Sequence, residues 1–152
     1  MPLLLVACAL PLASCRERAP AQPPGLRVLV ETEGGPQPVT PETVLRGGDR
    51  VRFVVEPGST PYLVLASVDT RGVATIYFPA HGNRSERVGP GPVELPGPVR
   101  LDEAPGIERV YALFSQEPIP VDAARKLIEQ APERLELLGV TVVSTTLHRM
   151  AR

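Results

Sequence analysis

The chain has 152 residues, which suits one domain that is large enough to bury a hydrophobic core. Its formal net charge is −1 and its pI is about 6.1, so no overall positive charge favours nucleic acid or an acidic membrane as a partner. With 43% hydrophobic residues, 19 prolines and 13 glycines, the composition is typical of a folded, turn-rich β protein and not of a low-complexity chain.

The N-terminal segment 1–14, MPLLLVACALPLAS, carries no charge. Its apolar run is too short to cross a bilayer, which takes about 20 residues, but it fits the apolar region of an export signal. Leu12-Ala13-Ser14-Cys15 has the form of a bacterial lipoprotein cleavage box, because small residues precede a cysteine. The basic residues that open such a signal are missing, so we expect the natural start to lie upstream. We therefore predict a truncated lipoprotein signal segment over 1–14.

Both cysteines lie near the N-terminus, which bears on how the chain is processed. Cutting before Cys15 would remove Cys8 and leave one thiol for a thioether-linked lipid, so Cys15 is the predicted lipidation site. Three alternatives stay open: processing at Cys8, two passive apolar cysteines, or a disulfide between them. Residues 15–25, which comprise the lipidated cysteine and RERAPAQPPG, are predicted to form a Pro-rich tether that holds a domain off a membrane.

Residues 26–149 are predicted to form one β-sandwich domain. Short apolar or alternating runs are separated by Gly and Pro signals, as is typical of an antiparallel, Ig-like sandwich of about 6–8 strands. Asp69-Thr70-Arg71-Gly72 is expected to be the tight turn of a hairpin. The expected strands span residues 26–33, 49–56, 61–69, 72–78, 87–95, 99–101, 107–115 and 140–148.

One helix is predicted within PVDAARKLIEQA, residues 120–131. Val121, Ala124, Leu127 and Ile128 fall on one helical face, and Pro120 suits the first turn. An apolar stripe of this width is more often packed on a sheet than used to bind a membrane. After Pro132 the run ERLELL is interpreted as the start of a second short helix that ends at Gly139.

The order of motifs over residues 45–116 resembles that of a known bacterial family. Gly48-Asp49-Arg50-Val51 leads into an apolar strand, and the segment from Asp69 to Pro79 gives a D-x-x-G-x-x-x-x-Y-F-P hairpin. Later come VELP (93–96) and GIERVYALFS (106–115). The chain resembles a domain of unknown function found in envelope lipoproteins and sometimes appended to caspase-like peptidases or protein kinases. The resemblance implies a small β-sandwich accessory module and carries over no catalytic residue.

The sequence predicts no catalytic site, no cofactor and no metal site. The two histidines, His81 and His148, are 67 residues apart, and neither H-x-H nor C-x-x-C occurs. A G-x-S-x-G motif is missing, and Gly89-Pro90-Gly91 is unsuited to a phosphate loop because proline lacks an amide proton.

We therefore expect a non-catalytic protein of the bacterial cell envelope, anchored in the outer membrane by a lipid on Cys15 and facing the periplasm. It would bind another envelope protein of unknown identity, and not nucleic acid, through an exposed strand edge or the 79–91 loop. The candidate contact residues of that loop are His81, Asn83, Arg84 and Arg87. The alternatives are a soluble periplasmic module that binds a small molecule or glycan and, less favoured, a hydrolase with an unrecognised site.

Overall fold

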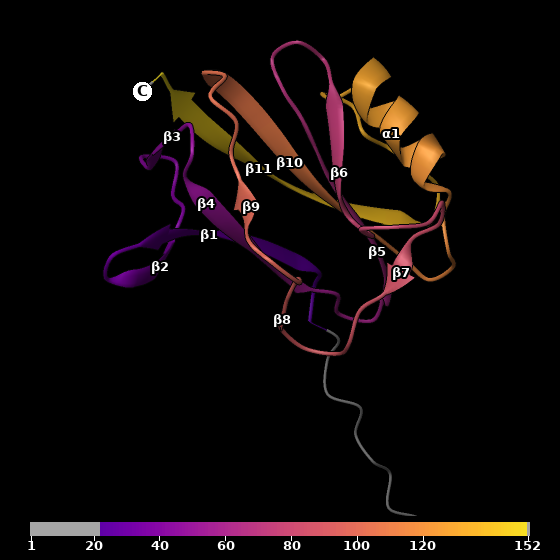
Figure 1. Cartoon of the computed structure of the whole chain (residues 1–152). Helices are drawn as coiled ribbons and strands as arrows, with labels where there is room; N and C mark the ends of the chain where they lie inside the picture. The colour runs from indigo at the N-terminus through magenta and orange to yellow at the C-terminus, as the bar shows by residue number, and fades with distance from the viewer. Residues whose placement is uncertain (1–21, 152) are drawn as a thin grey trace, which may run out of the picture.

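The computed structural model describes residues 22–151 and shows a mainly β protein in which two sheets pack face to face (Figure 1). The predicted sandwich with one helix near the C-terminus is confirmed. Four of the eleven strands among the described residues have only two or three residues, which leaves seven longer ones. The predicted signal segment and Cys15 lie outside the described residues.

The first sheet has the strand order β2-β1-β4-β8, with β9 also paired to β4. All of its pairings are antiparallel. Its outer face carries ion pairs and is therefore a solvated face. For example, Arg52 Nη2 lies 2.7 Å from Glu31 Oε1, and Arg52 Nη1 lies 2.5 Å from Glu94 Oε1. Its strands are β1 (Gly25–Thr32), β2 (Gly35–Pro38), β4 (Arg50–Glu56), β8 (Val93–Glu94) and β9 (Val99–Arg100).

The second sheet has the order β3-β11-β10-β5-β6, with β7 also paired to β5. Strand β3 runs parallel to β11, which is an exception to the expected antiparallel sandwich, whereas the other pairings in this sheet are antiparallel. The predicted hairpin turn is present between β5 and β6, where the Gly72 N–H donates to the Asp69 carbonyl. Its strands are β3 (Val44–Arg46), β5 (Tyr62–Val68), β6 (Ala74–Phe78), β7 (Glu86–Arg87), β10 (Gly106–Ser115) and β11 (Val140–Met150).

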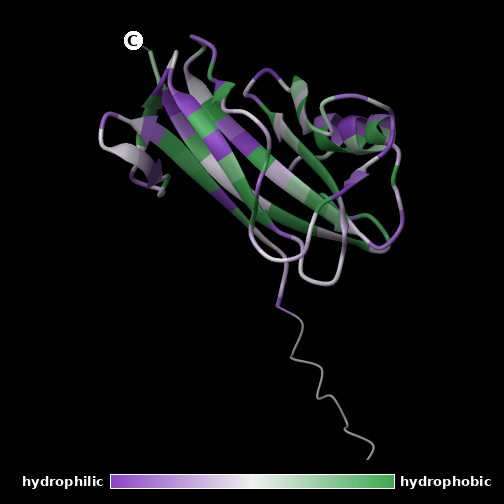
Figure 2. Ribbon diagram, turned by 60° about the horizontal axis from the view of Figure 1, so that its bottom comes forward, coloured by the Kyte–Doolittle hydropathy of each residue, from purple (hydrophilic) through white to green (hydrophobic). Residues whose placement is uncertain are grey.

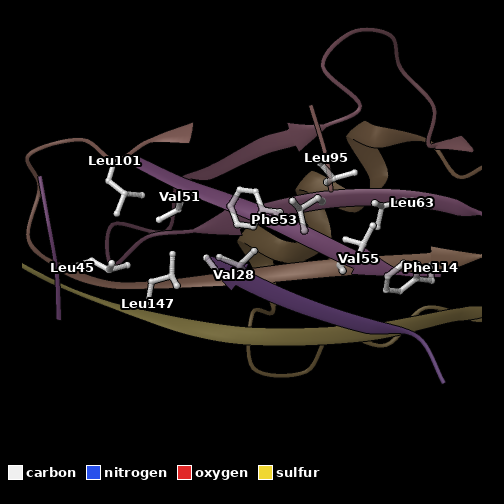
Figure 3. Close-up of a cluster of buried hydrophobic side chains, with 13 residues drawn as sticks. Val28, Leu45, Val51, Phe53, Val55, Leu63, Leu95, Leu101, Phe114 and Leu147 are labelled. Carbon is white, nitrogen blue, oxygen red and sulfur yellow. The ribbon is translucent and has the colours of Figure 1, made fainter. Parts of the chain in front are cut away.

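The space between the sheets is filled by apolar side chains from alternate strand positions (Figure 3). This alternation is why the strands carry both hydrophobic and hydrophilic colours along their length in Figure 2. Burying such side chains stabilises the fold by roughly 25 cal/mol per Å² of apolar surface. The buried members are Val28, Leu45, Val51, Phe53, Val55, Leu63, Leu65, Leu95, Leu101, Val110, Ala112, Phe114 and Leu147.

Helix α1 (Val121–Gln130) covers part of the outer face of the second sheet (Figure 1). Val121, Ala124 and Ile128 of the predicted apolar stripe are buried against that sheet, whereas Leu127 is only partly buried. Among residues 22–151 no side chain caps the start of the helix, but the Val121 N–H donates to the Asn83 carbonyl. The loop after β6 therefore supplies the cap that the local sequence lacks.

Two predictions about local structure are wrong. Residues 87–95 do not form one strand, because β7 belongs to the second sheet and β8 to the first, and the chain crosses between them at Gly89-Pro90-Gly91. ERLELL is not helical. Leu135 and Leu137 pack against the buried side chains between α1 and the second sheet, while Glu136 and Leu138 are exposed. That in-and-out alternation belongs to an extended segment, so tertiary packing overrides the helical propensity.

Candidate functional site

The most distinctive surface feature is an open edge of β11. One side of this strand pairs with β10 over residues 140–149, but on the other side β3 pairs only with residues 148–150. Within residues 22–151, the second edge of β11 therefore has no strand partner over residues 140–147. At the 3.3 Å rise of a strand residue, this edge is about 26 Å long. We call residues 140–147 the open edge.

The open edge has the composition of an inner strand. Its sequence, VTVVSTTL, contains no charged residue, no proline and no glycine, and six of its eight side chains are β-branched. Natural proteins usually protect exposed edges with charges, prolines or bulges, because unpaired N–H and C=O groups pair readily with another chain. None of these protective features occurs in the open edge.

A local turn just before β3 keeps the preceding residues from pairing with this edge. The Thr43 N–H donates to the Thr40 carbonyl at 3.0 Å, and the Thr40 N–H donates to the Thr43 hydroxyl at 2.9 Å. Pro41 lies inside this turn and has no N–H to add to a strand ladder. The short β3 therefore closes one end of the open edge and leaves the rest uncovered by the described residues.

Other outer strands of the two sheets differ from β11. Strand β2, GPQP, contains two prolines within four residues, so it is poorly suited to pair with a further strand. Strand β6 has five residues and an irregular register with β5, and its Ala74 carbonyl accepts a hydrogen bond from Arg125 of α1 at 3.1 Å. The open edge of β11 is thus both longer and less protected than either of these.

The core is incompletely covered beside the open edge. Strand β1 of the facing sheet approaches β11 there, and both strands are drawn along the lower side of the core in Figure 3. Leu26 of β1 and Val143 of β11 pack against the core but are only partly buried. An extended segment placed along the open edge would lie beside Val143, so an apolar residue on its inner face would find an apolar neighbour there.

A second feature is a buried polar network at one end of the sandwich. The Glu108 carboxylate accepts hydrogen bonds through Oε1 from the Tyr77 hydroxyl at 2.5 Å and from the Ser67 hydroxyl at 2.6 Å. Arg149 lies next to it, with Nε 3.4 Å from Glu108 Oε2 and Nη1 2.6 Å from Asp102 Oδ1. Burial and the negative charge of Glu108 raise the pKa of the Tyr77 hydroxyl well above its ordinary value, so Tyr77 stays protonated and donates.

This network opens onto a polar pocket of about 220 Å³. Besides the network itself, the turn between β5 and β6 and strand β9 contribute to its walls. Sequence reasoning missed this site, although a signal was present. Three polar residues of the network, Ser67, Glu108 and Arg149, each lie two positions from a core residue of the same strand. Because strand side chains alternate between faces, all three point inward. The core residues concerned are Leu65, Val110 and Leu147. The lining residues are Ser67, Asp69, Arg71, Val73, Thr75, Tyr77, Val99, Arg100, Leu101, Asp102, Glu108 and Arg149.

The four candidate loop residues are all exposed, and each makes different contacts. The Arg84 guanidinium donates to the Pro118 carbonyl at 2.7 Å, and Asn83 caps α1 through its carbonyl. The Arg87 guanidinium lies over the Tyr62 ring, 5.3 Å from its centroid. His81 lines a separate pocket of about 190 Å³ beside Phe78. Three of the four residues therefore make contacts that hold the loop in place.

Among residues 22–151, no three His, Cys, Asp or Glu side chains are arranged to hold a metal ion. No helix of this described part is both long and apolar enough to cross a membrane. Comparison of the chain with protein families, with curated proteins and with solved structures finds no match. The family resemblance over residues 45–116 therefore stays a prediction.

Proposed function

We propose that this protein is a lipid-anchored, non-catalytic module of the bacterial envelope that binds another protein by strand addition to the open edge of β11. The observation that supports this proposal is the unprotected backbone of residues 140–147. An incoming strand would extend the second sheet beyond β11, in line with β3. Strand addition of this kind obtains affinity from main-chain hydrogen bonds and specificity from alternate side chains.

The open edge can supply a useful binding free energy. Every second residue of a strand directs its N–H and C=O to one side, so an eight-residue edge offers about eight hydrogen bonds. At a net value of about 0.5–1.5 kcal/mol each, they stabilise the pairing by roughly 4–12 kcal/mol before the incoming segment loses its conformational freedom. Affinity in the micromolar range is therefore within reach if apolar side chains add to these bonds.

The chemistry of the open edge also defines the partner segment. The edge carries no charge, and its Val143 is only partly buried where it packs against the core. We expect an extended, largely uncharged segment of another envelope protein, with apolar residues at alternate positions on the face that lies beside Val143. A second copy of the same chain is the main competing occupant.

Site-specific photocrosslinking in cells tests this proposal. A photoreactive residue placed at Ser144, which is an exposed position of the open edge, should cross-link to one extended segment of the partner. The same residue at Gln37, which is exposed on the proline-containing β2, serves as the matched control and should not. A synthetic peptide of the cross-linked segment should then bind the purified chain.

Substitutions at the open edge test whether peptide binding depends on that edge. Thr141→Lys and Ser144→Lys place charges at exposed positions on the two faces of the open edge and should reduce peptide binding at least tenfold. Gln37→Lys should leave it unchanged. Binding that survives both edge substitutions, cross-links confined to folded surfaces of the partner, or cross-links only between copies of this chain would contradict the proposal.

The lipid anchor is tested separately, because Cys15 lies outside the described residues. Metabolic labelling with a fatty-acid analogue, followed by membrane fractionation, should give a labelled, membrane-bound chain. Cys15→Ala should lose both the label and the membrane association, whereas Cys8→Ala should keep them. If labelling depended on Cys8, then Cys8 and not Cys15 would be the lipidated residue. An unlabelled, soluble native protein would refute the lipid anchor.

A further inference from the structure

The polar network at the end of the sandwich is more deeply buried than its charges would suggest. Glu108 is 5% exposed and Arg149 is 7% exposed, although both are charged residues inside an otherwise apolar layer. Buried ion pairs contribute little to stability, because removal from water offsets the attraction between the charges. Apolar residues at these two inward positions would close the sandwich equally well, so the network invites a functional explanation.

Within residues 22–151, the network contains a buried donor without a partner, next to a carboxylate oxygen. Arg149 Nε is buried and has no hydrogen-bond acceptor among the described residues. Its nearest carboxylate oxygen, Glu108 Oε2, is 3.4 Å away, on the side of the carboxylate opposite the oxygen that accepts from Tyr77 and Ser67. Both residues line the 220 Å³ pocket. A group that accepts from Arg149 and donates to Glu108 would complete the network, and a hydroxyl does both through one oxygen.

The charges around the pocket balance one another. Three carboxylates and three guanidiniums line it, and Asp69 is paired with Arg71 at 2.6 Å while Asp102 is paired with Arg149 at 2.6 Å. A charged ligand would lose its hydration and meet both signs of charge, so it gains little from this site. A neutral ligand rich in hydroxyl groups can hydrogen-bond to carboxylates and guanidiniums alike.

From these observations we infer that the pocket binds one ring of a neutral, polyhydroxylated ligand, that is, a sugar unit of a glycan. The hydroxyl groups of Ser67 and Thr75 and the charged groups of the walls provide the donors and acceptors that such a ring requires. The pocket volume of about 220 Å³ suits one ring and not an extended chain. This site is separate from the open edge and does not depend on the partner proposed for it.

Calorimetric titration of the full chain, solubilised in a detergent without a sugar head group, tests the inference. The neutral probes are D-glucose, D-galactose and N-acetyl-D-glucosamine, and the charged analogues are D-glucosamine and D-glucuronate. At least one neutral sugar should bind with a Kd at or below the millimolar range. The charged analogues should bind at least tenfold more weakly.

Two variants locate the binding. Thr75→Trp adds a large side chain at an exposed position of the pocket wall, leaves the network intact and should abolish binding. Gln37→Trp, exposed on β2, is the matched control and should bind like the native chain. Glu108→Gln should weaken binding at least tenfold, and circular dichroism checks that it folds.

The outcomes are distinct. A neutral sugar that binds to the native chain and the control but not to Thr75→Trp supports the inference. Equal or tighter binding of either charged analogue would overturn the class of ligand. No binding of any neutral probe up to roughly 50 mM, or binding that persists in Thr75→Trp, would overturn the site. None of these results bears on strand addition at the open edge.

Discussion

Replacing Tyr77 with phenylalanine removes one hydroxyl group from the buried network and little else. The ring still stacks on Phe53, whose centroid is 5.1 Å away, but Glu108 loses the donor at 2.5 Å. A hydrogen bond to a charged group is worth about 1.5–3 kcal/mol, so Tyr77→Phe should lower the free energy of unfolding by that amount. Because a domain of this size loses about 2–4 °C per kcal/mol, the melting temperature should fall by several degrees.

Urea denaturation of the native chain, Tyr77→Phe and Tyr62→Phe measures this difference. Tyr62 is the matched control, because it lies outside the buried network, with the Arg87 guanidinium 5.3 Å from its ring centroid. Tyr62→Phe should change the free energy of unfolding by less than about 0.5 kcal/mol. The same small effect of both substitutions would show that the Tyr77 hydroxyl does not stabilise the buried Glu108 carboxylate.

The pH dependence provides an independent check on the same residue. Burial and Glu108 raise the pKa of Tyr77 above its ordinary value of 10.0 in the folded state. A raised folded-state pKa means that the stabilisation is fully present below pH 10 and is lost as the pH rises through the folded-state value. The stability difference between the native chain and Tyr77→Phe should therefore be constant at neutral pH and should shrink above about pH 10.

Further predictions concern the core and the turns. Phe114, which is fully buried, should lose about 3–5 kcal/mol of stability when replaced by alanine, as measured in urea. Burial raises the pKa of Asp69, but hydrogen bonds within its turn outweigh this effect and lower the pKa below 3.8. Asp69→Asn should therefore lower the free energy of unfolding by at most about 1 kcal/mol at pH 7. Unfolding measured against pH should show that this difference shrinks below about pH 4. A Cβ on Gly47 would lie 2.7 Å from the Glu103 Cα, so Gly47→Ala should destabilise the chain by about 1–3 kcal/mol, whereas Gly34→Ala, which meets only a threonine hydroxyl at 3.8 Å, should be nearly neutral in thermal melts.

Local patterns explain why much of the fold was predictable. The alternation of Val51, Phe53 and Val55 sets which face of β4 is buried, and the apolar spacing in residues 121–128 sets the face of α1. The turn from Asp69 to Gly72 is likewise closed by a hydrogen bond within four residues. Each of these features depends on neighbours a few residues away along the chain, so the sequence alone was sufficient to predict it.

Some local patterns nevertheless misled the prediction, since distant contacts decided the outcome. The run ERLELL favours a helix by itself. However, the preceding Pro132 carbonyl accepts a hydrogen bond from the Tyr111 hydroxyl at 2.7 Å. Leu135 also packs against the buried side chains between α1 and the second sheet. The burial of these groups outweighs the modest helical propensity of a six-residue segment.

The sequence by itself determined the β class, the hairpin and the amphipathic helix, because each is specified by the periodicity of side chains along a short stretch. Only the tertiary structure decided that β3 joins β11 in parallel and ends early, which creates the open edge. It alone also brought Ser67 and Glu108, which are 41 residues apart, together with Arg149 into one pocket. Strand order and register depend on pairings across the whole chain, and no local pattern encodes which edge stays without a partner.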